Sequence, residues 1–163
     1  MGAWMKVFLS HQKTDSELAT RIAVRLRSLH SIDSYLDVID PYVGGSIELL
    51  ADHIRNEMDK CTQLLAVISP ATAQSQWVPW EVGVATEKDF PLATFSGGQA
   101  LPPEFLRKWP YLRTDSDLDE YAKASKVARD GFHSRRGYLT ETAALQQSTR
   151  EFHRSLRAAL RQS

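Results

Sequence analysis

The sequence predicts an α/β protein built on an open parallel β-sheet with helices on both faces. Short apolar runs alternate along the chain with longer segments whose apolar residues recur at helical spacing. The run at residues 63–68 contains no charged residue, which is typical of a strand buried on both faces at the centre of a sheet. The chain has 163 residues, and at about 150 residues per domain we expect one compact unit.

The first part of the chain supplies two strand and helix units. Residues 6–10 form an apolar run that ends in polar residues, as a buried parallel strand does. Asp15 follows as the expected N-cap of a helix. Residues 34–39 predict a second strand, residues 40–46 a loop with glycine and proline, and Ser46 the cap of the next helix.

The second part of the chain continues the alternation. The run at residues 63–68 is the third strand, and Ser69-Pro70 ends it. The remaining elements are a helix at 73–88, strands at 92–95 and near 111–113, and helices at 117–130 and 140–161.

The last of these helices is predicted to be amphipathic. Helical spacing gathers an apolar face opposite a narrow basic stripe. The apolar residues are Leu145, Phe152, Leu156, Ala159 and Leu160, and the basic residues are Arg150, Arg154, Arg157 and Arg161. We expect a helix docked through its apolar face with the basic face in solvent; self-association and phosphate contact are the alternatives.

Composition excludes several classes of protein. The 20 basic residues balance 20 acidic ones, which argues against a globally basic nucleic-acid binder. Cys61 is the single cysteine, so there is no internal disulfide and no multi-cysteine metal site, and the five histidines never fall at ligand spacing. No apolar stretch reaches the length of a membrane span or a signal-peptide core, so we expect no membrane association and a cytoplasmic location.

The zero net charge is the sum of two unlike parts. Residues 1–106 carry 8 basic and 13 acidic residues, and residues 107–163 carry 12 basic and 7 acidic residues. The net charges are therefore −5 and +5. The parts could attract each other within the fold, the tail could be merely solvated, or the asymmetry could mark an anionic ligand or a partner subunit.

A candidate site follows from the expected sheet order. If the strands lie in the order 2-1-3-4-5, ligands bind beyond the carboxyl ends of the first and third strands, where the winding changes direction. Polar residues 10–13 follow the first strand and residues 69–77 follow the third. The helix after the third strand also points its N-terminus at this crevice, which favours a phosphate or another anion.

Glu81 is the most unusual residue of that helix. Helical spacing puts it beside Trp77 and Trp80, and a carboxylate buried among indoles costs free energy unless something binds it. Glu81 therefore either holds a ligand or is a structural residue paired with Lys88, His11 or a backbone amide. Trp77 lies one helical turn before it and can reach the same ligand.

A single carboxylate among aromatic side chains restricts the chemistry. Ordinary glycoside hydrolysis needs a second carboxyl group to protonate the leaving oxygen. The nicotinamide of NAD⁺ is already cationic and leaves as a neutral group, so it needs no acid. Glu81 could hold the ribose hydroxyls and stabilise the developing positive charge, while Trp77 stacks on a planar base. Phosphate-binding glycine loops and zinc-binding HExxH motifs do not occur.

Three segments, in order, resemble a known family. Residues 7–11 followed by Asp15 resemble the first strand and loop of Toll/interleukin-1 receptor (TIR) domains, and residues 35–37 with a glycine at 44 or 45 resemble the second strand and the BB loop. Residues 65–69 resemble the third strand, and residues 75–81 carry the Ser-x-Trp-x-x-x-Glu signature. We accordingly expect a TIR-like domain at 5–135 and a C-terminal amphipathic helix at 136–163 packed on the same domain.

The resemblance implies a flavodoxin-like three-layer fold and, as in bacterial, plant and some animal members, cleavage of NAD⁺ to nicotinamide and ADP-ribose or a cyclic ADP-ribose. NAD⁺ is then the substrate, and no cofactor or metal is expected. Glu81 matches the catalytic glutamate. The residues matching substrate-binding positions are Ser10, His11, Gln12, Lys13, Asp37, Gly45 and Trp77.

The resemblance to TIR domains also implies partners. Asp37 and the loop at 40–46 match the segment that completes a neighbour's active site in assembled enzymes, which implies a homo-oligomer through TIR–TIR contacts. Many enzymatic relatives carry an arginine or an aromatic residue where this chain has His11-Gln12, so recognition of the base is expected to differ. The chain resembles a stand-alone bacterial TIR protein of the kind that produces the signal in Thoeris anti-phage defence and acts through a separate effector. It also resembles virulence proteins that disturb host TIR signalling. A non-enzymatic interaction module and a nucleobase transferase acting on deoxyribosides are the alternatives.

Overall fold

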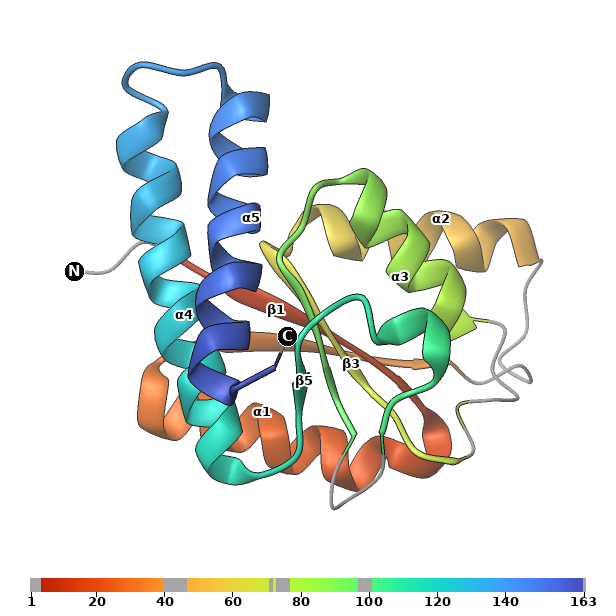
Figure 1. Cartoon of the computed structure of the whole chain (residues 1–163). Helices are drawn as coiled ribbons and strands as arrows, with labels where there is room; N and C mark the ends of the chain where they lie inside the picture. Colours follow the sequence, from red (N-terminus) through yellow and green to blue (C-terminus); the bar gives the residue numbers. More distant parts are fainter. Residues whose placement is uncertain (1–3, 40–46, 71, 73–76, 97–100, 163) are drawn as a thin grey trace.

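Five parallel strands form a single sheet in the order β2-β1-β3-β4-β5, which confirms the predicted order. The computed structural model describes residues 4–39, 47–70, 72, 77–96 and 101–162. All neighbouring strands run parallel, and Figure 1 shows the sheet between its covering helices. The strands are β1 (Lys6–Gln12), β2 (Asp33–Ile39), β3 (Gln63–Val67), β4 (Leu92–Phe95) and β5 (Tyr111–Leu112).

Helices cover both faces of the sheet, as the sequence predicts. On one face an apolar cluster joins the sheet to α1 (Ser16–His30), α4 (Asp115–Arg135) and α5 (Glu141–Leu160). On the other face a second cluster joins it to α2 (Ile47–Asp59) and α3 (Trp77–Glu87). Figure 1 shows α1 and the pair α2 and α3 on opposite sides of the sheet. The flavodoxin-like three-layer fold with an additional C-terminal helix is therefore confirmed.

β1 and α4 are each longer than predicted by two residues or more. β1 continues past Ser10 to Gln12 because its pairing with β2 continues to the partners Gln12 and Ile39. α4 covers Asp115–Arg135 instead of residues 117–130. Thr114 caps its start by accepting a hydrogen bond from the Asp117 N–H at 3.1 Å. The loop at 40–46, with Ser46, and the first turn predicted at 73–76 lie outside the described residues.

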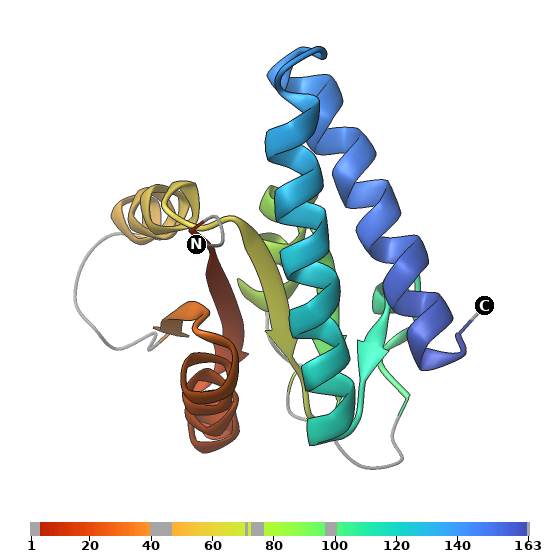
Figure 2. The same cartoon turned by 90° about the vertical axis from the view of Figure 1, so that its left-hand side faces the viewer.

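The helices α4 and α5 form an antiparallel hairpin. Figure 2 shows the two helices side by side, with their connected ends extending beyond the sheet. The Arg135 guanidinium donates to Ser148 Oγ at 2.7 Å and to Glu151 Oε2 at 2.5 Å, so the end of α4 is fixed by α5. This contact explains the extra turns of α4, because its partners lie on another helix that local propensity cannot anticipate.

The predicted apolar face of α5 is partly wrong. Phe152 and Leu156 are fully buried, and Leu160 packs against the same cluster. Ala159 is exposed, and Leu145 is only half-buried. Ala144 is fully buried in their place. The side of α5 that is buried depends on where α4 lies, and the spacing of apolar residues in α5 does not give the position of α4. Arg150, Arg154 and Arg161 are exposed, as predicted, whereas Arg157 of the same stripe is half-buried.

Ion pairs join the two oppositely charged parts of the chain. Arg21 contacts Asp115 at 3.1 Å, and Arg25 contacts Asp119 at 2.8 Å, so α1 and α4 are linked. Hydrogen bonds from Arg25 and then His30 lower the pKa of Asp119 to about 2. In both pairs the base comes from residues 1–106, which are acidic overall, and the acid comes from residues 107–163, which are basic overall. The pairs therefore do not neutralise the excess charge of either part.

Within the described residues, no helix is both long and apolar enough to cross a membrane.

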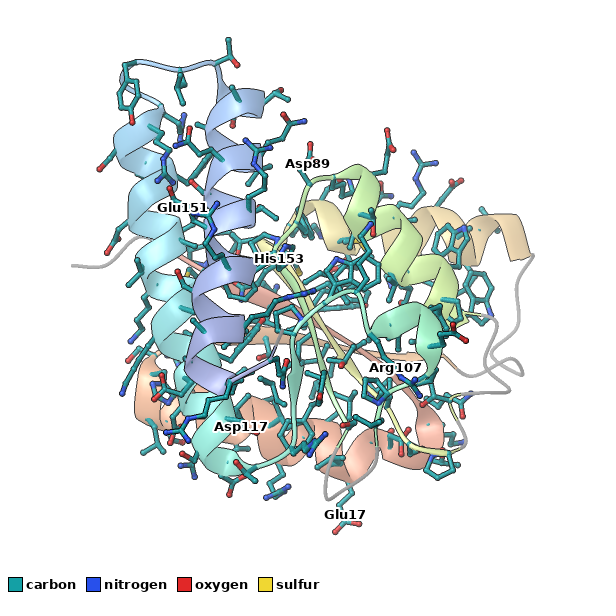
Figure 3. The ribbon with its side chains drawn as sticks, in the orientation of Figure 1. Glu17, Asp89, Arg107, Asp117, Glu151 and His153 are labelled. Atoms are coloured by element: carbon teal, nitrogen blue, oxygen red, sulfur yellow. The ribbon has the colours of Figure 1, made fainter. Side chains whose placement is uncertain are left out.

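His153 fixes α5 to the beginning of β4, and its charge state should make stability depend on pH. Its Nε2 accepts a hydrogen bond from the Leu92 N–H at 3.1 Å, and Figure 3 shows His153 on the sheet side of α5. Burial, followed by repulsion from Arg157, lowers the pKa of His153 from 6.5 to about 4. Between about pH 4 and 6.5, the ring of His153 is thus mostly neutral in the folded protein and mostly protonated in the unfolded chain.

We therefore expect the free energy of unfolding to fall by up to about 3 kcal/mol as the pH drops from 6.5 to 4. Above pH 6.5 the ring is neutral in both states and the contribution is fully present. Urea denaturation at pH 7, 5.5 and 4.5 measures this. His153→Gln keeps an acceptor and does not titrate, so its stability should depend less steeply on pH; equal slopes would contradict the role of His153.

Candidate active site

Glu81 lies at the centre of the carboxyl edge of the sheet, hydrogen-bonded to β1. β1 and β3 are neighbours, and the chain winds outward from them in opposite directions, so the switch point lies between their carboxyl ends. Glu81 on α3 is fully buried there. The Ser10 hydroxyl on β1 donates to Glu81 Oε1 at 2.5 Å. The fold thus places a desolvated carboxylate with a short hydrogen bond where ligands bind in this architecture.

Two tryptophans precede this carboxylate on α3, by four residues and by one. Trp77 is the first residue of α3, and both Trp77 and Trp80 are half-buried against the apolar cluster under α2 and α3. Their rings meet edge to face, with centroids 5.4 Å apart and an interplanar angle of 88°. Trp80 therefore holds the plane of the Trp77 ring in place, which gives an ordered aromatic surface one turn before Glu81.

The segment 10–13 divides between the two faces of the sheet. Ser10 lies on the α3 face with Phe8, and strand alternation puts the half-buried Gln12 on the same face. His11 alternates to the α1 face with Val7 and Leu9, where it is 1% exposed and its Nδ1 lies 2.8 Å from the Leu9 carbonyl oxygen.

This division decides which predicted residues meet. His11 is not brought together with Glu81, whereas Ser10 is. Lys13 is exposed in the short 3-10 helix η1 (Lys13–Asp15), just beyond β1. Asp37 pairs in register with Ser10 across the β1–β2 ladder, so its backbone lies next to the Ser10 backbone. Gly45, which the sequence assigns to the site, lies outside the described residues.

A second link crosses the switch point and was missed by the sequence analysis. Asp15 precedes α1 as predicted, but its side chain makes no capping hydrogen bond. Its Oδ2 instead accepts a hydrogen bond at 2.9 Å from the hydroxyl of Ser69, which lies two residues beyond the end of β3. The Ser69 N–H donates to Thr72 Oγ1 at 2.9 Å. A polar residue shortly after each central strand is the only sequence signal for this contact.

The Asp15–Ser69 contact should contribute to stability as a coupled pair. We expect a double-mutant cycle of Asp15→Ala and Ser69→Ala to give a coupling free energy of about 1–2 kcal/mol, because the bond is charge-assisted and only partly exposed. Asp15→Asn retains a carbonyl acceptor and should lose less than Asp15→Ala. Denaturant titration of the three variants and the double variant measures the coupling; additive losses would mean that the contact contributes nothing.

One known protein family matches most of the chain. A sequence profile described as TIR domain matches residues 7–126. The chain belongs to the TIR domain family. The matched region begins in β1, includes all five strands and ends inside α4. No curated protein matches the sequence.

The residues matched to the TIR family include the candidate site but not the tip of the α4–α5 hairpin. Ser10, Asp15, Ser69 and Glu81 all fall within residues 7–126. The second half of α4 and all of α5 lie beyond the match, although Phe152 and Leu156 belong to the same apolar cluster as the sheet. TIR domains function in signalling and commonly self-associate, and some cleave NAD⁺. No group of three metal-ligating side chains occurs in the described part of the chain.

Proposed function

We propose that this TIR domain cleaves the nicotinamide–ribose bond of NAD⁺, as an NAD⁺ glycohydrolase or an ADP-ribosyl cyclase. The observation that supports it most is the hydrogen-bonded pair of Ser10 and Glu81 at the switch point, with Trp77 one turn earlier. NAD⁺ is the substrate in this proposal, and the reaction needs no further cofactor.

The proposed reaction uses the carboxylate as an electrostatic and positioning group. Glu81 accepts hydrogen bonds from the hydroxyls of the nicotinamide ribose, and Trp77 stacks on a base of the substrate. The bond between the anomeric carbon and the nicotinamide nitrogen breaks, and its electron pair neutralises the pyridinium ring. The ribosyl group that remains carries positive charge, which the negative Glu81 stabilises in the transition state.

The fate of the ribosyl cation determines the product. Attack by water, which then loses a proton to solvent, gives ADP-ribose. Attack by a hydroxyl or an adenine nitrogen of the same molecule gives a cyclic ADP-ribose. The choice depends on how closely the bound substrate folds back on itself. A cyclic product fits a signalling role in anti-phage defence with a separate effector that responds to it.

Burial of Glu81 sets a condition on this reaction. The carboxylate is fully buried and Ser10 already donates to it, so ribose hydroxyls reach it only when neighbouring side chains move. Assembly of several TIR domains is a physical means of making such a change, because contacts between copies can hold the open arrangement. We therefore place the activity in a homo-oligomer.

The same observation favours a second candidate function. A fully buried glutamate bonded to a serine on the neighbouring strand also fits a structural residue in a non-enzymatic module that works by TIR–TIR contact. Such a module would self-associate without turning over NAD⁺. A virulence factor acting on host TIR signalling would belong to this class.

Product analysis at two protein concentrations tests the proposal. NAD⁺ is incubated with pure protein at low and at high concentration, and nicotinamide, ADP-ribose and cyclic products are separated by chromatography. We expect nicotinamide release that rises more steeply than protein concentration. A protein that self-associates but releases no nicotinamide at high concentration would refute the enzyme and favour the interaction module. Turnover of deoxynucleosides without NAD⁺ would point to nucleobase transfer.

A further inference from the structure

A cavity of about 480 Å³ lies at the amino edge of the sheet, away from Glu81. Its walls come from Trp4 just before β1, the last turn of α1, the first residue of β2 and the middle of α4. At about 3.3 Å per strand residue, Ser10 lies about 13 Å from this end of β1, which begins at Lys6. The cavity is thus separate from the candidate active site, and its volume suits a small organic ligand.

Basic side chains without a salt bridge dominate one wall of this cavity. Lys126 and Arg129 both line it from α4, and neither forms a salt bridge within the described part of the chain. Arg129 Nε is buried and has no hydrogen-bond partner among the described residues. Burial, followed by the nearby Arg136, lowers the pKa of Arg129. A partly desolvated guanidinium of this kind is stabilised by an anion.

The acidic side chains of the cavity do not supply that anion. Asp33 is engaged by Arg27, whose Nη1 donates to it at 2.7 Å. Asp130 lines the same space and forms no salt bridge with Lys126 or Arg129 in the described residues. A carboxylate in this position can accept hydrogen bonds from sugar hydroxyls, as acidic residues do in nucleotide sites.

Trp4 provides a flat apolar surface at the same cavity. Trp4 is 56% exposed, whereas the other three tryptophans are half-buried. An indole beside cations that form no salt bridge among the described residues suits a ligand that combines a planar ring with an anionic group. We propose that the amino-edge cavity binds a small phosphate ester of a planar heterocycle, such as a nucleoside monophosphate. Lys126 and Arg129 hold the phosphate, Trp4 stacks on the ring, and Asp130 accepts from the sugar.

Chemical-shift mapping by NMR tests this site directly. The ¹⁵N-labelled protein is titrated with adenosine monophosphate, with adenosine and with inorganic phosphate. We expect the monophosphate to bind at least about tenfold more tightly than either fragment and to shift the amides of Ser31, Asp33 and Asp130. Equal affinity for phosphate alone would overturn the part assigned to Trp4, and shifts confined to Ser10, Ser69 and Glu81 would overturn the site.

Matched variants separate this site from the proposed active site. Lys126→Gln and the double variant with Arg129→Met should weaken the monophosphate at least about tenfold. The Arg129 guanidinium also lies over the Phe132 ring, 4.9 Å from its centroid, so thermal denaturation shows whether the double variant keeps its fold. Lys123→Gln lies on the same helix outside the cavity and should bind like the wild type. Glu81→Gln should leave this binding intact even if NAD⁺ turnover fails. Unchanged affinity in Lys126→Gln and in the double variant would refute the proposal.

Discussion

Glu81→Gln is expected to lower the rate of nicotinamide release from NAD⁺ by at least about a hundredfold. The amide has nearly the volume of the carboxylate, so the helix and its packing are retained. In the proposed reaction the negative charge of Glu81 stabilises the ribosyl cation. The amide lacks that charge, and the loss is expected in the transition state more than in substrate binding. Single-turnover measurement of nicotinamide by chromatography, at saturating NAD⁺ and high protein concentration, gives the rate.

The matched control for this variant lies on the same helix. Glu87→Gln removes one negative charge from an exposed position of α3 and should leave turnover within about twofold of the wild type. Circular dichroism and thermal denaturation of both variants show whether either has lost its fold. A folded Glu81→Gln protein that releases nicotinamide at the wild-type rate would remove Glu81 from the reaction and leave it a structural residue.

Ser10 offers a finer test of the same site. Ser10→Ala removes the hydroxyl that donates to Glu81 at 2.5 Å, so a buried carboxylate loses a donor. The two candidate functions predict different results for Ser10→Ala. If the Ser10–Glu81 pair is only structural, the variant loses stability alone. If the protein is an enzyme, the folded variant also releases nicotinamide more slowly.

The fold class was predictable because strands and helices alternate along the chain. The charge-free run at 63–68 indicated a central strand, and the order 2-1-3-4-5, which accompanies the resemblance to TIR domains, is the order observed. Glu81 was recognisable as a candidate site residue because a carboxylate among tryptophans is unusual on a largely apolar helix. Local sequence is thus sufficient to single out a candidate residue when its chemical type conflicts with that of its neighbours.

Contacts between distant segments were not predictable in the same way. Asp15 has the type and position of an N-cap, yet Ser69, 54 residues away, takes its carboxylate. His11 matches a loop position of the TIR family, but pairing with β2 continues the strand through His11 and Gln12. The divergence of the Ser10 and His11 side chains was expected for an extended segment; the burial of His11 on the opposite face was not. In both cases a tertiary partner decides between two locally acceptable arrangements.

The packing of α5 connects the region beyond the TIR match to the centre of the sheet. Phe152 is 1% exposed and meets the ring of Tyr121 edge-on, with centroids 5.8 Å apart. Tyr121 on α4 is fully buried and accepts a hydrogen bond from Gln63 Nε2, at the start of β3, at 2.6 Å. Side chains thus join α5 to β3 through α4, which predicts that α5 unfolds together with the sheet.

Phe152→Ala is expected to lower the free energy of unfolding by about 4 kcal/mol, because it removes a buried ring and leaves a cavity against Tyr121. A loss of that size should lower the midpoint of thermal unfolding by about 10 °C. Arg154→Glu reverses an exposed charge two residues further along α5 and should change stability by less than about 0.5 kcal/mol. Calorimetry should show one transition in each protein. If Phe152→Ala instead left the main transition at the wild-type temperature, α5 would be an appendage that the TIR fold does not need, since a helix integral to the core cannot lose its largest buried side chain without destabilising the sheet it covers.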